Sequence, residues 1–195
     1  YLHFTMDDNP SLSEEVKNRY KSLYTGVFYE RYILGLWVAA DGIVYPMFDP
    51  DIHAITVKRN WTRIFVAGDF GIQNATTFGI FGYYAPERRY HQLASYYHSG
   101  REEGQKTTKE YADDLVRFLQ DNLVIPEYVV LDPSAAPMIV ELRKHSYFTR
   151  HNIDILPAKN RDDLGIQVVS FLLNERKFTL DPSCTKDIEE FTTYA

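Results

Sequence analysis

The sequence predicts an α/β fold, with a mixed central sheet flanked by helices and an N-terminal extension made of a helix and a hairpin. Short apolar runs bounded by Gly, Pro and polar residues recur from residue 61 onward, which is typical of strands. The first three runs follow one another over short links, which favours antiparallel pairing. The later runs alternate with helical patterns, which favours parallel pairing.

Composition limits the class of protein. The 195 residues, 45% of them hydrophobic, can bury the core of one compact domain and some further structure. The single cysteine, Cys184, excludes an internal disulfide and a cysteine-based zinc site, and it fits a reducing cytoplasm. The formal charge of -6 argues against a broadly basic protein that coats nucleic acid. We expect neither a signal peptide nor an apolar run of the roughly 20 residues that span a bilayer.

Residues 1–60 are expected to form a linker segment and a β-hairpin. Ser11 and Glu14 match a capping box, which predicts a helix to about Tyr24. A second short helical pattern covers 27–34, a hairpin with an Asp-Gly type I′ turn is expected at 35–45, and 46–60 reads as a connector.

Residues 61–195 are expected to form one domain. Its strands are predicted at 63–69, 76–84, 89–97, 127–131, 152–156 and 176–180, and its helices at 107–121, 135–144, 163–174 and from 183 onward. In the first helix, one face is expected to carry the apolar residues Tyr111, Leu115, Phe118 and Leu119. Three antiparallel strands, a helix, a parallel strand and further helices form the order of a ribonuclease H-like fold.

Two aspartates each follow a short apolar run. Asp69 comes after the run at 64–67 and Gly68, and Asp132 comes directly after the run at 128–131. If these strands are parallel neighbours, both carboxylates emerge at one edge of the sheet, where open α/β sheets bind ligands. Two adjacent carboxylates repel each other unless a cation lies between them, and oxygen ligands favour Mg²⁺ or Mn²⁺. For either aspartate alone, a turn or helix cap is the commoner role, and the pair favours a metal site only modestly.

Basic residues supply weaker candidates for contact with a phosphate backbone. Lys159, Arg161 and Lys144 are expected near the Asp132 edge, although a solvated loop is the commoner role for such charges. Arg101 and Lys106 lie in a further loop that could contact DNA, a partner or neither.

The six histidines show no metal-ligand spacing. We expect them at the surface or near helix ends, where the helix dipole favours them. His91 and His98 are seven residues apart on one predicted strand, which would place them on opposite faces.

Three upstream segments carry a resemblance to a known family. Residues 3–12 (HFTMDDNPSL), 26–37 (GVFYERYILGLW) and 41–45 (DGIVY) resemble the segment that joins the ATPase and nuclease parts of the large terminase subunit, the DNA-packaging motor of tailed bacteriophages. Residues 68–71 (GDFG) and 131–134 (LDPS) are similar to the motifs that hold the first two metal-binding acids of that nuclease. The resemblance covers essentially the whole chain.

This resemblance implies a metal-dependent endonuclease that cuts double-stranded viral DNA with little sequence specificity during genome packaging. Asp69 would bridge two Mg²⁺ or Mn²⁺ ions and Asp132 would bind one of them. The implied partners are double-stranded DNA, the portal protein and the small terminase subunit, and the implied location is the host cytoplasm. Two alternatives stay open: a non-catalytic docking domain for the portal or the small subunit, and another two-metal ribonuclease H-like enzyme such as a junction resolvase.

The sequence departs from the family pattern in two ways. It contains no P-loop of the form G-x-x-x-x-G-K-[ST], so we expect no ATP hydrolysis through that motif in this chain. The family's third acid, in an Asp-His-Ala type motif, is also missing, so we expect it either beyond residue 195 or replaced. The acids that could replace it chemically are Asp181, Asp187, Glu189 and Glu190, although capping or solvated roles are commoner for each. Without the third acid, the second ion should be weakly held.

Overall fold

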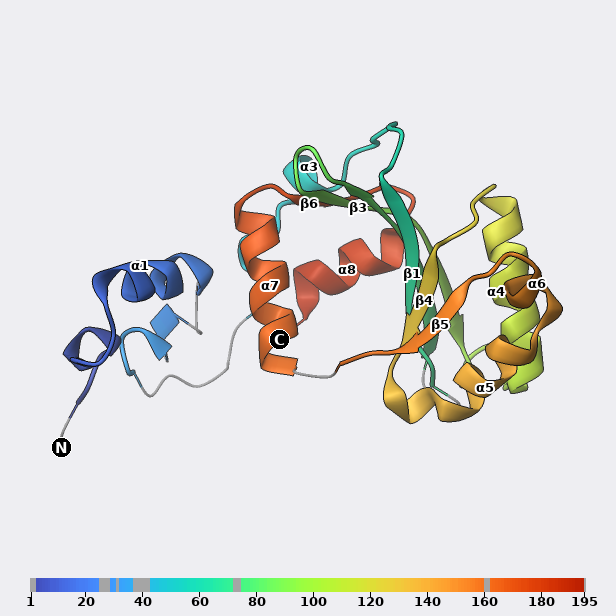
Figure 1. Cartoon of the computed structure of the whole chain (residues 1–195), viewed down its shortest axis with the longest axis horizontal. Helices are drawn as coiled ribbons and strands as arrows, with labels where there is room; N and C mark the ends of the chain where they lie inside the picture. The colour runs from blue at the N-terminus through green and yellow to red at the C-terminus, as the bar shows by residue number, and fades with distance from the viewer. Residues whose placement is uncertain are drawn as a thin grey trace.

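The computed structural model describes residues 3–24, 29–30, 32–36, 43–71, 75–159 and 162–194, and a mixed sheet of six strands lies at its centre (Figure 1). The strands are β1 (Arg63–Asp69), β2 (Ala75–Tyr84), β3 (Arg89–Ser99), β4 (Tyr128–Leu131), β5 (Asp154–Pro157) and β6 (Phe178–Leu180), in the order β5-β4-β1-β2-β3-β6. The pairs β1–β2 and β2–β3 are antiparallel, and β1–β4, β4–β5 and β3–β6 are parallel. All six predicted strands are present, and the predicted ribonuclease H-like fold is confirmed.

Helices cover both faces of this sheet. They are η1 (Met6–Asp8), α1 (Glu14–Leu23), α3 (Pro50–His53), α4 (Thr108–Asp121), η2 (Pro133–Ala135), α5 (Ala136–Lys144), α6 (Ser146–Arg150), α7 (Asp162–Asn174) and α8 (Thr185–Thr193). Figure 1 shows α4, α5 and α6 on one side of the sheet and α7 and α8 on the other. The short helices α3 and α6 were not predicted. Among the described residues, none of these helices is long and apolar enough to cross a membrane.

The predicted capping box at the start of α1 is wrong. The helix begins two residues later, after Ser13, whose hydroxyl accepts a hydrogen bond from the Val16 N–H at 3.3 Å. A turn at 9–12 delays it, because the Asn9 side chain accepts the Ser11 N–H and the Asn9 carbonyl accepts the Leu12 N–H. In the predicted helix at 27–34, residues 29, 30 and 32 are helical, and 27, 28 and 31 lie outside the described residues. The predicted hairpin at 35–45 falls largely on 37–42, which also lie outside the described residues.

The segment predicted as a connector packs against the sheet. Within it, α3 is capped by Asp49, and the Ile55 N–H donates to the Leu180 carbonyl at 3.0 Å beside β6. The Phe48 ring stacks on Phe191 of α8 with ring centroids 4.9 Å apart. Residues 48–55 therefore cover the β6 edge of the sheet. The predicted division of the chain into a linker segment and a nuclease domain at residue 60 stays a prediction.

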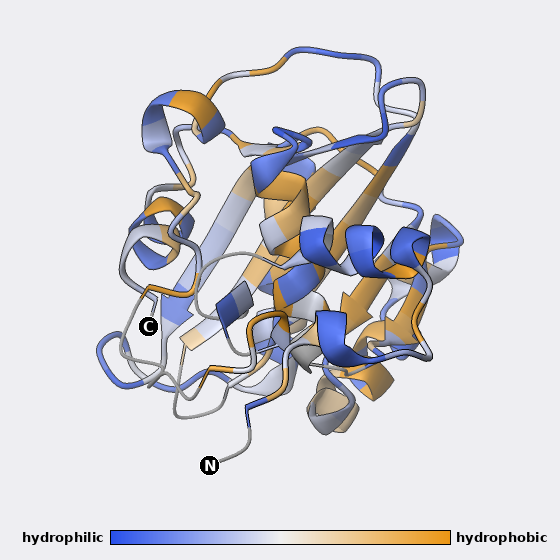
Figure 2. Ribbon diagram, turned by 90° about the vertical axis from the view of Figure 1, so that its left-hand side faces the viewer, coloured by the Kyte–Doolittle hydropathy of each residue, from blue (hydrophilic) through white to orange (hydrophobic). Residues whose placement is uncertain are grey.

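The main core lies between the sheet and α4 and α5. Val66, Ile80 and Leu131 from three strands are fully buried there, against the predicted apolar face of α4, which contributes Tyr111, Leu115 and Leu119. Each such side chain contributes about 1.5–3 kcal/mol when it is buried. Figure 2 shows hydrophobic stretches along the central strands and mostly hydrophilic loops between them.

A β-bulge in β3 overturns the prediction for two histidines. Ala94 pairs with Ile80 and Gln92 with Phe81, so Leu93 is the extra residue. The extra residue reverses the alternation of faces, and His91 and His98 therefore lie on the same face, the one that α4 covers.

These histidines are buried core residues, and the predicted surface location is wrong. His91 is 2% exposed, stacks on Trp61, and has Nδ1 2.8 Å from the Thr179 hydroxyl. His98 is 4% exposed, with Nδ1 2.9 Å from the Tyr111 hydroxyl. Burial lowers the pKa of His91, which favours the neutral imidazole at neutral pH.

Gly68 is required by close packing immediately before Asp69. A Cβ atom on this residue would lie 2.5 Å from Cδ1 of Phe78 and 2.8 Å from the carbonyl oxygen of Thr77. It would also lie 3.1 Å from Cδ2 of Leu131 on the other neighbouring strand. Gly68 thus lets β1 fit between β2 and β4 at the end of the strand.

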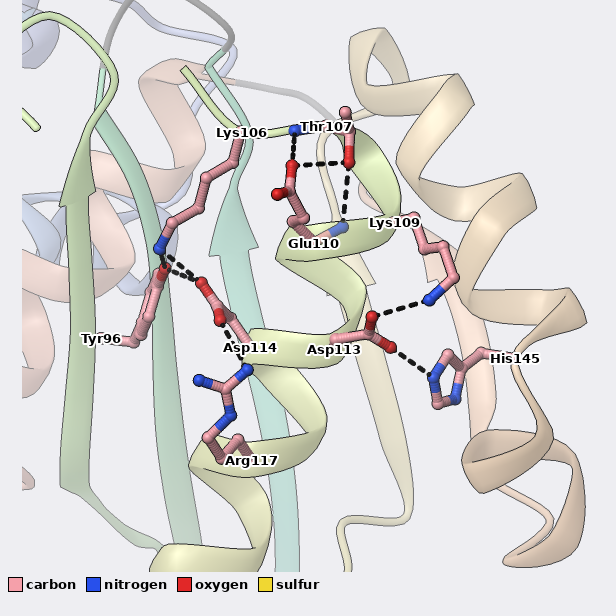
Figure 3. A network of polar contacts seen from close by, with 9 residues as sticks. All are labelled: Tyr96, Lys106, Thr107, Lys109, Glu110, Asp113, Asp114, Arg117 and His145. Atoms are coloured by element: carbon pink, nitrogen blue, oxygen red, sulfur yellow. Dashed lines mark hydrogen bonds and ion pairs between the residues drawn. The ribbon is translucent and has the colours of Figure 1, made fainter. Parts of the chain in front are cut away.

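Lys106 anchors the loop between β3 and α4 in a polar network (Figure 3). Its Nζ atom lies 2.7 Å from the Asp114 carboxylate of α4, which also accepts the Tyr96 hydroxyl at 2.6 Å. Burial raises the pKa of Asp114, but the hydrogen bonds from Lys106 and Tyr96 outweigh burial and hold that pKa below its usual value. Lys106 therefore has a structural partner.

We expect Gly68→Ala to destabilise the domain by about 1–3 kcal/mol, because the Thr77 carbonyl is backbone and cannot move aside easily. Urea unfolding monitored by circular dichroism measures this change. Gly165→Ala is the matched control: a Cβ there meets nothing within 4 Å, and alanine favours the helix α7. Equal effects of the two substitutions would show that the packing at Gly68 does not limit stability.

We expect Asp114→Asn to lower the free energy of unfolding by about 1–3 kcal/mol at neutral pH, because it leaves the half-buried Tyr96 hydroxyl and Lys106 ammonium groups with a weaker acceptor. The folded-state pKa of Asp114 lies below its unfolded value, so the stabilisation is present above a pH of about 3.9 and is lost as the pH falls through the folded-state pKa. The difference between the wild type and the variant should therefore shrink in acid, as measured by urea unfolding across pH. A difference that stays constant down to a pH of about 2 would contradict this account.

Candidate active site

Asp69 and Asp132 lie at the ends of neighbouring parallel strands. β1 pairs with β4 in a register that ends with Gly68 opposite Leu131. Asp69 follows Gly68 as the last residue of β1, and Asp132 follows Leu131 in the turn after β4. Neighbouring strands are about 4.8 Å apart. The parallel pairing predicted for these two strands is therefore confirmed. It brings the two carboxylates to one edge of the sheet, the one formed by the C-terminal ends of β1 and β4.

The two aspartates also belong to the same face of the sheet. Phe65 and Tyr128, which stand opposite each other in the register, stack with ring centroids 5.3 Å apart. Asp69 and Asp132 follow these residues by four positions each, and side chains alternate with a period of two along a strand. This face is the one covered by α7 and α8, on the opposite side from the main core (Figure 1).

The local surroundings of the two carboxylates differ. Asp69 is exposed, whereas Asp132 is half-buried and accepts the Ser134 N–H on Oδ1 at 2.7 Å. The capping role that we considered for Asp132 is thus present. A carboxylate has two oxygens with several acceptor positions, so capping orients the group and is compatible with coordination of a cation.

The described residues contain no group of three or more His, Cys, Asp or Glu side chains that could hold a metal ion. Three of the acids considered as replacements have other partners. Asp181 accepts the Ser183 N–H and hydroxyl, Asp187 accepts the Gln92 amide at 2.9 Å, and Glu189 pairs with Lys186.

The fourth of these acids, Glu190, lines a small cavity between α8 and the sheet. The cavity has a volume of about 60 Å³, and Asp187, Lys186, Tyr97 and Thr77 line it as well. Thr77 is the register partner of Asp69, so α8 places acidic side chains near this part of the sheet without completing a cluster of three within the described chain.

The structure places the three basic residues predicted at this edge differently. Lys159 is exposed and lies beside it, because the preceding Ala158 N–H donates to the Leu131 carbonyl at 2.7 Å. Lys144 does not lie there: it ends α5, which starts near Asp132 and runs about 12 Å away from it. Arg161 lies outside the described residues.

No protein-family model and no curated protein matches the sequence. Among solved structures, the large terminase of a thermophilic bacteriophage is 42% identical, with a TM-score of 0.78; the match covers all of this chain and 47% of that one. The complex of the same terminase with ATP-γ-S gives a TM-score of 0.79. The nuclease domain of the P22 large terminase shares the fold at 12% identity, with a TM-score of 0.60 and 79% of each chain covered. The chain spans about half the length of the thermophilic phage protein, and it belongs to the large terminase family.

Proposed function

We propose that this chain is a metal-dependent endonuclease that cleaves double-stranded viral DNA with little sequence specificity during genome packaging. The observation that carries the proposal is the placement of Asp69 and Asp132 side by side on one face, at the ends of two parallel strands. Membership of the large terminase family supports it. Its partners would be duplex DNA, the portal protein and the small terminase subunit, in the host cytoplasm.

The chemistry of the donor set fits a divalent cation. Asp69 and Asp132 offer only oxygen ligands, which suit Mg²⁺ or Mn²⁺, and a cation between them would relieve their mutual repulsion. Asp69 would bridge two ions and Asp132 would hold one. Such ions, when bound, activate a water molecule and stabilise the leaving oxygen of a phosphodiester.

The chain's own residues would position the substrate. The exposed position of Asp69 leaves this end of β1 accessible to a bulky polymer, and the exposed Lys159 at the same edge would contact the phosphate backbone.

We expect Asp69→Asn and Asp132→Asn each to slow plasmid cleavage in Mn²⁺ or Mg²⁺ by about 100-fold or more, because each removes a charged metal ligand. Gel electrophoresis of a supercoiled plasmid measures the rate, with EDTA as the metal-free reference. Asp121→Asn is the matched control, because Asp121 is exposed at the end of α4. Cleavage that survives Asp69→Asn would reject the site. If the wild type itself did not cleave in either metal, the explanation would be either the missing third acid or a docking domain for the packaging machinery, and a longer chain that continues past residue 195 would separate the two.

A second expectation concerns the metal without catalysis. Mn²⁺ should raise the melting temperature of the wild type and of Asp121→Asn, because a ligand that binds only the folded state stabilises it. Asp69→Asn and Asp132→Asn should show a smaller shift. Differential scanning fluorimetry across a Mn²⁺ titration measures the effect, and equal shifts in all four proteins would show that the two aspartates are not the ligands.

A further inference from the structure

A strongly basic surface lies at the opposite end of the sheet from Asp69 and Asp132. It is formed by three segments, 58–63, 85–89 and 175–177, which we call the basic turns. They carry the cationic residues Lys58, Arg59, Arg63, Arg88, Arg89, Arg176 and Lys177 and the acidic residues Glu87 and Glu175. The basic turns are thus positively charged in a chain whose formal charge is -6.

Hydrogen bonds and ion pairs hold the three segments together. The Thr62 N–H donates to the Tyr83 carbonyl at 2.8 Å, and Arg59 pairs with Glu87 at 2.8 Å, so the first segment lies against the turn between β2 and β3. The Tyr90 N–H donates to the Lys177 carbonyl at 2.7 Å, which ties that turn to the one between α7 and β6. Both turns lie in the upper part of Figure 1.

Arg88 and Arg176 occupy equivalent positions on the two turns. Each lies two residues before a register pair of the parallel strands β3 and β6, Tyr90 with Phe178. Both are exposed, and neither has an ion-pair partner among the described residues. The structure therefore places two unpaired guanidinium groups on neighbouring turns.

The backbone at these positions is unfavourable for arginine. Arg88 and Arg176 both have φ of 52°, in the left-handed region that glycine or asparagine adopts more readily. The same region is occupied by Asn152, the residue type expected there. Leu123 also adopts this region, with φ of 54°, so the conformation alone does not mark a binding site. Arg88 and Arg176 stand out because their charges gain no ion pair among the described residues.

We infer that the basic turns bind the phosphate backbone of double-stranded DNA, as a second contact separate from the Asp69 edge. The choice of DNA rests on the proposed function. The seven residues of β1 span about 20 Å, so the basic turns contact a part of the duplex, or a different duplex, that does not enter the Asp69 edge. Arg88 and Arg176 are the central contacts, because a guanidinium group binds phosphate oxygens through paired hydrogen bonds.

The composition of the basic turns favours phosphate over an acidic protein partner. None of the exposed large hydrophobic residues of the described chain lies within the three segments. The buried centre of a protein–protein interface is usually apolar and poor in charge, whereas contacts with DNA are dominated by Arg and Lys. The basic turns resemble the second kind of surface.

The test uses the double variant Arg88→Gly, Arg176→Gly in the full chain, with Asp69→Asn present so that DNA stays intact. Fluorescence anisotropy with a labelled duplex of about 30 base pairs, in EDTA, measures affinity across salt concentrations. We expect binding about tenfold weaker and a slope of log affinity against log salt reduced by about 2. Glycine suits a φ of 52°, so the melting temperature should stay the same or rise.

Two controls accompany this variant. Arg88→Lys with Arg176→Lys keeps the charge but loses the paired hydrogen bonds, so it should restore the salt slope while binding stays weaker than in the wild type. Arg19→Ala with Arg117→Ala removes two exposed arginines on α1 and α4 and should leave the salt slope nearly unchanged.

The inference is overturned if the glycine variant and the Arg19 and Arg117 control show the same affinity for DNA and the same salt slope. An acidic protein surface would then be the better partner for the basic turns. Failure of the proposed nuclease would give a different result. The wild type would not cleave the plasmid, but the glycine variant would still bind DNA more weakly than the wild type.

Discussion

The parallel pairing of β1 with β4 is the constraint on which the rest of the structure depends. It joins the antiparallel β1–β2–β3 unit to β4 and β5, and its register places Asp69 beside Asp132. Gly68 favours this pairing, because a Cβ atom there would lie too close to Phe78 and to the Thr77 carbonyl. The same contacts that close the core therefore set the spacing of the two carboxylates, so that fold and candidate site cannot vary independently.

Much of this fold was predictable because its signals are local. β1 has its predicted bounds, and the apolar face of α4 carries Tyr111, Leu115 and Leu119 as expected. The bulge at Leu93 was not predictable, because one extra residue in a strand changes which side chains face the core without altering composition. That single residue explains why two histidines expected on opposite faces of the strand lie on the same face.

The candidate site also has parts that could be predicted from the sequence and parts that could not. Asp69 and Asp132 could be found because each ends an apolar run, whereas the position of Lys144 depended on the direction of α5, which sequence spacing does not reveal. Arg88 and Arg176 stand 88 residues apart in the sequence and become neighbours only when β6 adds to β3. A local signal existed in the Glu-Arg-Arg turn at 87–89, but nothing in the sequence linked it to Arg176.

The lengths of the strands also bear on self-association. The long strand β2 has partner strands on both sides, whereas β6 pairs with only three residues of β3, Tyr90 to Gln92. Residues 93–99 of β3 therefore have no strand partner on the β6 side among the described residues. Strand addition by another chain needs such unpaired backbone groups, so the tendency of copies of this domain to join their sheets depends on how this part of β3 is covered.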